Sequence, residues 1–236
     1  MALPKIDLPR YTVTIPSTGE ELNMRPYLVK EEKVLLMALE SEDSKQITMA
    51  IRNLIESCIE GVNLDKLAGF DVEKLFLELR GVSVGETINL MGNCSEEGCD
   101  GQTPVQISTK DITMTDLEPD ANVIKLTDTV GVTMSYPTAN TLRDVGLDAL
   151  DTVEGLMDLI ISCVDTIFDS EQVHNVSQED SEEVKDFIES LTTDQFQRIS
   201  AFFSKTPRLE YNLEFECVKC KKQNQQHLRG LANFFT

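Results

Sequence analysis

Two short cysteine loops decide the fold of this chain: Cys94-Ser-Glu-Glu-Gly-Cys99 and Cys217-Val-Lys-Cys220. Each loop stands between extended, polar segments, so each is expected to form a turn that places two sulfur atoms on one side of a metal ion. Two such turns together supply the four soft ligands of a tetrahedral zinc shell. The sequence therefore predicts one structural zinc ion per chain, bound by Cys94, Cys99, Cys217 and Cys220.

Two alternatives for these four cysteines are a pair of disulfides and a set of free thiols. The first residues, MALPKIDLPRY, lack the apolar core of a secretory signal, which favours a reducing compartment and a metal over disulfides. A shell of four cysteines leaves no open position for substrate or water, so the predicted site is structural. His227 follows Cys220 by seven residues and is an alternative ligand in place of a cysteine.

The remaining residues carry no catalytic signature. Cys58 and Cys163 lie on apolar helical faces, where a thiol packs as a small hydrophobic group. His174 and His227 are the only histidines, and the chain has neither a phosphate-binding glycine loop nor a Gly-x-Ser-x-Gly motif. We therefore expect a non-enzymatic protein with no catalytic residues and no cofactor-binding residues apart from the metal ligands.

Hydrophobic spacing around the cysteine loops predicts a mixed α+β fold. Strands are expected at 11–15, 21–24, 85–91, 104–112 and 208–215, with a turn at Gly92-Asn93 and a hairpin within 123–134. Helices are expected at 29–41, 138–150 and 153–168. Three more are expected to begin after a cap residue: Asp43 or Ser44, Asp71, and Thr192, which forms a capping box with Gln195. An acidic loop, 171–183, precedes the last helices.

The order of these elements repeats, which predicts an internal duplication. Leu54-Ile-Glu-Ser-Cys58-Ile59 is similar to Leu159-Ile-Ile-Ser-Cys163-Val164 at an offset of 105, and the two cysteine pairs are offset by 123. The expected repeats are 1–120 and 121–236, which form two related helical lobes with short β-hairpins, joined into one compact unit by the zinc-ribbon-like element of four cysteines. The alternative is a chance likeness between two hydrophobic helices.

The charge of the chain excludes some classes of partner. Asp and Glu number 41 and Lys and Arg 21, giving a net charge of −20 over 236 residues. Direct binding to nucleic acid or to a membrane surface needs a cationic footprint, and no apolar run reaches the roughly 18 residues of a membrane span. Residues 205–236 are an exception, with six basic and three acidic residues. That basic segment either docks against a neighbour or offsets thiolate charge, and its terminal Phe234 and Phe235 pack either on this chain or on a partner.

Several stretches resemble the T4-type bacteriophage baseplate hub protein family. They are Leu3-Pro-Lys-Ile-Asp-Leu-Pro9, Met24-Arg-Pro-Tyr-Leu-Val-Lys-Glu-Glu-Lys33, Leu54-Ile-x-x-Cys58, Phe70-Asp-Val-Glu73 with Leu79-Arg80, the two cysteine pairs and Leu228-x-Gly-Leu-x-x-Phe-Phe235. The resemblance runs nearly end to end, and the Arg-Pro-Tyr-Leu-Val-Lys-Glu-Glu stretch is its most specific part.

The resemblance implies a non-enzymatic role in building the central hub of a contractile tail's baseplate, as a structural subunit or as an assembly factor. It implies other baseplate hub proteins as partners, with the tape-measure protein as a further candidate, and a place in the virion tail, in the host cytoplasm during assembly, or in both. The alternative function is a zinc-ribbon adaptor in transcription or nucleic-acid processing. A zinc hydrolase is a third hypothesis, which the filled metal shell and the scarcity of histidines disfavour.

Overall fold

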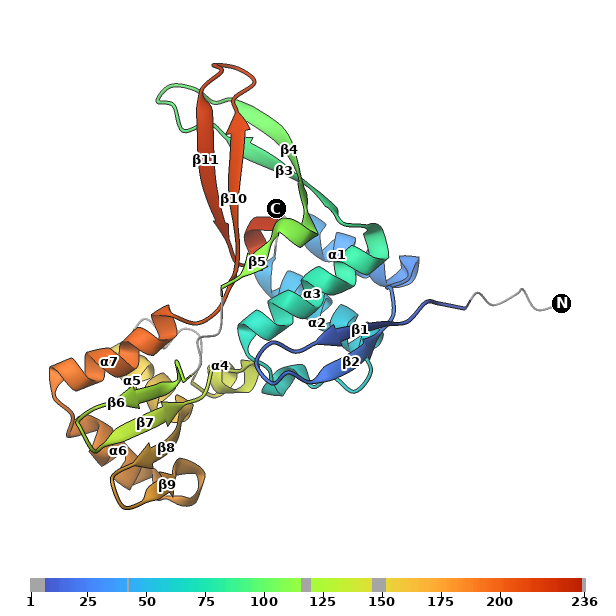
Figure 1. The fold of residues 1–236 in the computed structure, drawn as a ribbon. Helices are drawn as coiled ribbons and strands as arrows, with labels where there is room; N and C mark the ends of the chain where they lie inside the picture. Colours follow the sequence, from blue (N-terminus) through green and yellow to red (C-terminus); the bar gives the residue numbers. More distant parts are fainter. Residues whose placement is uncertain (1–6, 42, 116–119, 146–151, 235–236) are drawn as a thin grey trace. The chain divides into compact units, whose positions relative to one another are not determined.

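A computed structural model of the chain describes residues 7–41, 43–115, 120–145 and 152–234. The chain forms two compact units (Figure 1). The first unit is built from the chain up to Leu64, from Phe70–Thr115 and from the segment that starts at Arg208; the second is built from Asp65–Gly69 and Asp116–Pro207. Helices and antiparallel strands occur in both units, so the predicted α+β class is confirmed.

The first unit contains three helices and three small sheets among its described residues. Its elements are β1 (Tyr11–Thr14), β2 (Glu21–Met24), α1 (Val29–Glu40), α2 (Ser44–Cys58), α3 (Gly69–Val84), β3 (Thr87–Asn93), β4 (Gln102–Ser108), β5 (Thr113–Met114), β10 (Leu209–Glu216) and β11 (Gln223–Arg229). β1 pairs with β2, β3 pairs with β4, and β10 lies between β11 and β5. A short 3-10 turn, Leu231–Phe234, follows β11.

Caps and turns account for where these helices begin. The Asp43 carboxylate accepts hydrogen bonds from the backbone N–H groups of Lys45 and Gln46 at the start of α2, as expected for a cap. α3 begins at Gly69, two residues before the expected cap at Asp71. The Asp71 carboxylate is buried and accepts hydrogen bonds from the backbone N–H and the hydroxyl of Ser17, at 2.9 and 2.7 Å. Asp71 thereby holds the β1–β2 turn against α3.

The expected turn at Gly92-Asn93 is wrong, because β3 continues through both residues. Gly92 is required in this strand by a close contact: a Cβ built on it would lie 2.6 Å from the ring of Phe215 in β10. The β3–β4 and β10–β11 hairpins share one apolar core with the turn Leu231–Phe234. Phe234 is 1% exposed in this core. Phe234 therefore packs on its own chain, whereas Phe235 lies outside the described residues.

The second unit carries one four-stranded antiparallel sheet and, among the described residues, four helices. Its elements are β6 (Val123–Lys125), β7 (Gly131–Met134), α4 (Ala139–Val145), α5 (Val153–Cys163), β8 (Val164–Phe168), β9 (Val173–Asn175), α6 (Ser181–Glu189) and α7 (Thr193–Ser204). The strand order is β6-β7-β8-β9. The capping box of Thr192 and Gln195 forms at the start of α7, as expected.

The expectation of one helix over 153–168 is wrong at its C-terminal end. The helix ends at Cys163, and Val164–Phe168 is strand β8, paired with β7 through Val132↔Ile167. Val164, Thr166 and Ile167 are β-branched, which disfavours a helix and suits a strand. The long-range pairing with β7 decides between the two structures, and apolar spacing alone does not reveal such a pairing.

The compact units differ from the expected repeats 1–120 and 121–236. The break after Thr115 lies close to the expected boundary, but the segment that starts at Arg208 belongs to the first unit. The physical reason is that β10 pairs with β5 and that Leu209, Leu213 and Leu228 join the core of the first unit. All four paired cysteines therefore lie within the first unit and do not join the two units.

One backbone arrangement nevertheless occurs in both units. In the first, Met24 bridges to Ile59, and the backbone N–H of the next residue, Arg25, donates to the carbonyl of Cys58 at 3.0 Å. In the second, Met134 pairs with Val164, and the N–H of Ser135 donates to the carbonyl of Cys163 at 2.7 Å. In each unit, the second strand of a hairpin thus pairs with the residue that follows a helix ending in cysteine.

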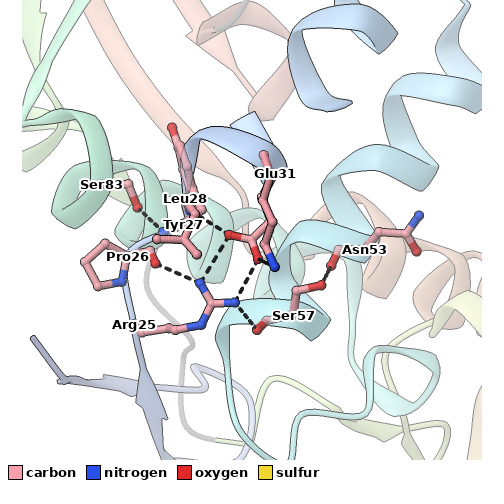
Figure 2. A network of polar contacts seen from close by, with 9 residues as sticks. Arg25, Pro26, Tyr27, Leu28, Glu31, Asn53, Ser57 and Ser83 are labelled. Carbon is pink, nitrogen blue, oxygen red and sulfur yellow. Dashed lines mark hydrogen bonds and ion pairs between the residues drawn. The ribbon is translucent and has the colours of Figure 1, made fainter. Parts of the chain in front are cut away.

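The connection Arg25-Pro26-Tyr27, between β2 and α1, is held by a polar network (Figure 2). The guanidinium of Arg25 donates to both carboxylate oxygens of Glu31, at 2.8 and 3.2 Å, and to the carbonyl oxygens of Pro26 and Ser57. The hydrogen bond with Arg25 lowers the pKa of Glu31. Because Ser57 lies in the last turn of α2, Arg25 satisfies a carbonyl that the helix leaves unpaired. These contacts fix the path of the chain between β2 and α1.

Candidate metal centre

The two cysteine loops lie at the tips of two β-hairpins of the first unit (Figure 1). Cys94 follows the last residue of β3, and β4 begins three residues after Cys99. Cys217 follows the last residue of β10, and β11 begins three residues after Cys220. Regular strand pairing runs up to both loops, with Asn93↔Gln102 in one hairpin and Glu216↔Gln223 in the other. The strands thereby fix where each loop lies.

The four sulfur atoms come together as the spacing predicts. All four Sγ atoms lie within 4.8 Å of one another, with Cys94 and Cys220 at 3.5 Å and Cys99 and Cys217 at 3.9 Å. A tetrahedral zinc ion with Zn–S bonds of about 2.3 Å needs sulfur atoms about 3.8 Å apart. The donor set and the sulfur separations therefore fit a zinc ion. None of the six cysteines forms a disulfide, which disfavours the disulfide alternative.

Backbone N–H groups are directed at the sulfur atoms in a repeated pattern. The N–H of Glu96 donates to the Cys94 sulfur at 3.5 Å. The backbone N–H groups of Gly101, Lys219 and Lys222 likewise favour the thiolate forms of Cys99, Cys217 and Cys220, each two residues earlier in the chain. Such donors stabilise a thiolate and orient it toward a metal. The pattern follows from the tight turns, in which Gly98 and Lys221 have positive φ angles of 77° and 64°.

The pKa values of these thiols show why the cluster suits a cation. Hydrogen bonding from the backbone N–H of Cys220, and then from that of Lys219, lowers the pKa of Cys217 to about 6. At Cys220 the N–H of Lys222 favours the thiolate, but desolvation and the three neighbouring thiols outweigh it and raise the pKa to about 12. A cation bound among the four sulfur atoms would offset the repulsion between neighbouring thiolates.

Lysines of the second loop pair with acids of the first. Lys219 forms an ion pair with Asp100, and Lys222 forms one with Glu96 at 2.6 Å. The thiolates of the cluster add to the negative charge around these lysines: Cys99 and Cys217 raise the pKa of Lys219 after the larger effect of Asp100. Lys219 and Lys222 therefore offset negative charge within the cysteine loops.

Two buried polar side chains join the loops, and sequence reasoning missed both. The Oδ1 of Asn224 accepts hydrogen bonds from the N–H and the hydroxyl of Ser95, and its Nδ2 donates to the carbonyl of Lys222 at 2.8 Å. The hydroxyl of Thr103 accepts a hydrogen bond from the N–H of Val218 at 3.1 Å. Asn224 is 6% and Thr103 8% exposed. Neither residue lies in a recognisable motif, because each acts on a loop more than 100 residues away.

Gly101 allows the two cysteine loops to approach each other, a role that sequence reasoning missed. A Cβ on this residue would lie 2.6 Å from the Cys217 sulfur and 3.3 Å from the Cys99 sulfur. Only glycine leaves room for the first loop to approach the second so closely. A glycine two residues after a ligand cysteine is a signal that could have indicated this contact.

The other candidate residues do not join the cluster. His227 lies on β11, where its Nδ1 contacts the Oδ1 of Asn212 and its Nε2 lies 3.6 Å from a carboxylate oxygen of Glu210. Cys58 and Cys163 are buried at 2% and 0% exposure, as predicted for core thiols. Burial raises the pKa of Cys58 to about 11 and that of Cys163 to about 12, so both are poor nucleophiles at neutral pH.

Comparison with protein families agrees with the resemblance seen in the sequence. The family model described as T4 bacteriophage base plate protein matches residues 8–236. The chain belongs to this family. Membership of the T4 base plate family indicates a structural protein of a phage baseplate, which contacts other baseplate proteins in the virion tail. Neither the curated proteins nor the solved structures gave a significant match.

No helix in the described part of the chain combines the length and the apolar character that a membrane crossing requires.

Proposed function

We propose that this chain is a non-enzymatic protein of the central hub of a contractile-tail baseplate, acting in its structure or assembly through protein–protein contacts. The observation that carries the proposal is the family match over residues 8–236, which favours a baseplate role over that of a zinc-ribbon adaptor in transcription or nucleic-acid processing. The hub position rests on the resemblance of the stretches 24–33 and 228–235 to hub proteins.

We propose further that the two cysteine loops share one structural zinc ion, bound by Cys94, Cys99, Cys217 and Cys220. Sulfur separations of 3.5 and 3.9 Å and the N–H of Glu96, which donates to the Cys94 sulfur, support this ligand set. The ion would supply positive charge among four thiolates and would hold the tips of the β3–β4 and β10–β11 hairpins together. Because the shell would be complete, it would add stability without binding substrate.

The shared arrangement of Met24, Cys58, Met134 and Cys163 supports the predicted duplication. We infer that the hairpin and the following helices of the two units descend from one ancestral segment. A profile built from many relatives of residues 8–64 should then detect the segment 122–164. If that profile scores 122–164 no better than shuffled sequence, the duplication is wrong.

Cross-linking of assembling tails tests the hub proposal. Tails and tail precursors isolated from infected cells are cross-linked, and the peptides joined to this chain are identified by mass spectrometry. We expect cross-links to other hub proteins, and to the tape-measure protein if the hub is the site where that protein docks. Cross-links confined to the periphery of the baseplate would contradict the hub position and leave the baseplate family assignment intact. Comparison of finished virions with precursors shows whether the chain stays in the tail or acts only in the host cytoplasm during assembly.

A further inference from the structure

The second unit contains a groove with an apolar floor, away from the cysteine loops. The groove has a volume of about 310 Å³ and lies between the β8–β9 hairpin and helix α6. Val130, Ile167, Phe168 and Phe187 form its floor, and all four are only half-buried. We call it the β9–α6 groove. Half-buried aromatic and aliphatic side chains gathered in one concave site are typical of a binding surface.

The floor of the groove depends on a glycine. Gly131 in β7 lies directly opposite Phe168 in β8. A Cβ on Gly131 would lie 2.4 Å from the Cζ of Phe168 and 2.8 Å from the carbonyl oxygen of Ile124. The Phe168 ring therefore lies against the backbone of β7, where a side chain would otherwise stand. Gly131 therefore leaves room for the Phe168 ring, which lines the groove together with Val130.

The rim of the groove is acidic. Asp169, Glu179 and Glu183 line it, and its described lining includes no Lys or Arg. Asp169 accepts hydrogen bonds from the N–H groups of Glu171 and Gln172, at 2.7 and 2.8 Å, and these bonds lower its pKa. The Nδ1 of His174 lies 3.2 Å from a carboxylate oxygen of Glu179. Carboxylates thus surround an apolar floor at neutral pH.

The charge of the surrounding segment reinforces this rim. Residues 116–207 contain 19 Asp and Glu against five Lys and Arg. Three of the five basic residues, Lys125, Arg198 and Lys205, line a different pocket beside α7. Lys185 on α6 forms an ion pair with Glu189 at 4.0 Å. The groove therefore lies in a negative field that attracts cations and raises the association rate of a positively charged partner.

We propose that the β9–α6 groove docks a basic, amphipathic segment of another protein. A leucine- or phenylalanine-sized side chain of that segment packs on Phe168 and Phe187, and flanking lysines or arginines pair with Asp169, Glu179 and Glu183. The proposal deepens the proposed function, because it assigns a surface and a partner chemistry to one of the contacts expected of a baseplate protein. It rests on the groove itself, so it can fail while the hub position stands.

Binding of a synthetic peptide to the full chain tests this proposal. The probe is a fluorescein-labelled twelve-residue peptide in which lysines flank leucines, and binding is followed by fluorescence anisotropy at low and moderate salt. We expect the E179Q/E183Q double variant to bind at least tenfold more weakly. The matched control E182Q/D186Q, which removes two exposed carboxylates of helix α6 outside the groove, should change binding less than twofold. Replacing the leucines by serine should weaken binding by about tenfold.

Four outcomes would overturn the proposal. Equal weakening by the two double variants would show general attraction to an acidic surface. Equal binding of the leucine and serine peptides would show that the apolar floor is not used. Absence of peptide binding to the unmodified chain would show that the groove does not bind a basic, amphipathic segment. Self-association of the chain in sedimentation velocity that is lost in E179Q/E183Q would show that a second copy, presenting Lys125, Arg198 and Lys205, is the occupant.

Discussion

Asn224 accepts two hydrogen bonds from Ser95, one from its N–H and one from its hydroxyl, each at 2.9 Å, although 129 residues separate the two in sequence. The same amide donates to the carbonyl of Lys222. One buried side chain thus joins the loop of Cys94 and Cys99 to the loop of Cys217 and Cys220. The cysteine loops are fastened by protein contacts as well as by any metal they bind.

Replacing this amide should loosen both loops. Asn224→Ala leaves the N–H of Ser95 and the carbonyl of Lys222 without their partner, which we expect to lower the free energy of unfolding by about 2 kcal/mol. Zinc affinity, measured by competition with a chromophoric chelator, should fall by roughly 10- to 100-fold, as for other supporting residues of metal sites. The exposed neighbour Gln225→Ala is the control, and its change should stay within about 0.5 kcal/mol. Equal effects of the two substitutions would refute the role given to Asn224.

Gly101 provides a steric test of the site. Gly101→Ala places a methyl group 2.6 Å from the Cys217 sulfur, so the two loops must move apart and zinc affinity should fall at least tenfold. Gly69→Ala is the matched control, because a Cβ there meets nothing within 4 Å and alanine suits a helix. The chelator competition assay compares the two variants. Full zinc affinity in Gly101→Ala would mean that the loops approach each other differently.

The pair of Arg25 and Glu31 gives a prediction for pH. Because Arg25 lowers the pKa of Glu31, the stability from this pair is fully present above the ordinary carboxyl value of 4.5 and is lost as the pH falls through the lower folded-state value. Glu31→Gln should cost about 2 kcal/mol at pH 7, and the difference from the unmodified chain should shrink in acid. Urea unfolding at several pH values measures it, with Glu40→Gln, an exposed change on the same helix, as the control. A difference that stays constant down to pH 3 would contradict this assignment.

Loss of a metal ligand should cost more stability than loss of a core thiol. Cys217→Ser removes one donor of the proposed shell, and we expect it to lower the melting temperature strongly and to abolish its response to chelators. Cys58→Ser changes a packed thiol on α2 and should leave the chelator response intact. Thermal unfolding with and without EDTA separates the two effects. An equal chelator response in both variants would argue against Cys217 as a ligand.

Local signals predicted the parts of the fold that local chemistry decides. The Asp43 cap, the capping box of Thr192 and Gln195 and the turns of the cysteine loops all form, because each depends on residues two to four positions apart. Apolar spacing placed most helices, but it extended α5 through Val164–Phe168, since the pairing of β8 with β7 is a long-range contact. The return of β10 and β11 to the first unit was missed for the same reason.

The sequence predicts the four cysteines of the candidate metal site but not the residues that hold the cysteine loops in place. Four cysteines in two close pairs indicate a metal from sequence alone, because few other arrangements use that spacing. Asn224, Thr103 and Gly101 act through contacts that only the folded chain creates. The β9–α6 groove has the same origin, since the Phe168 ring fits against β7 only because Gly131 lies opposite it.

The metal content of the purified chain tests the central claim most directly. The protein is expressed and purified without added metal or chelator, and zinc is measured by elemental analysis against protein concentration. We predict one zinc ion per chain in the unmodified protein and in Cys58→Ser, and less than about a tenth of an ion in the double variant C94S/C217S. Absence of zinc from a folded chain whose four paired cysteines all react with an alkylating agent would contradict the account.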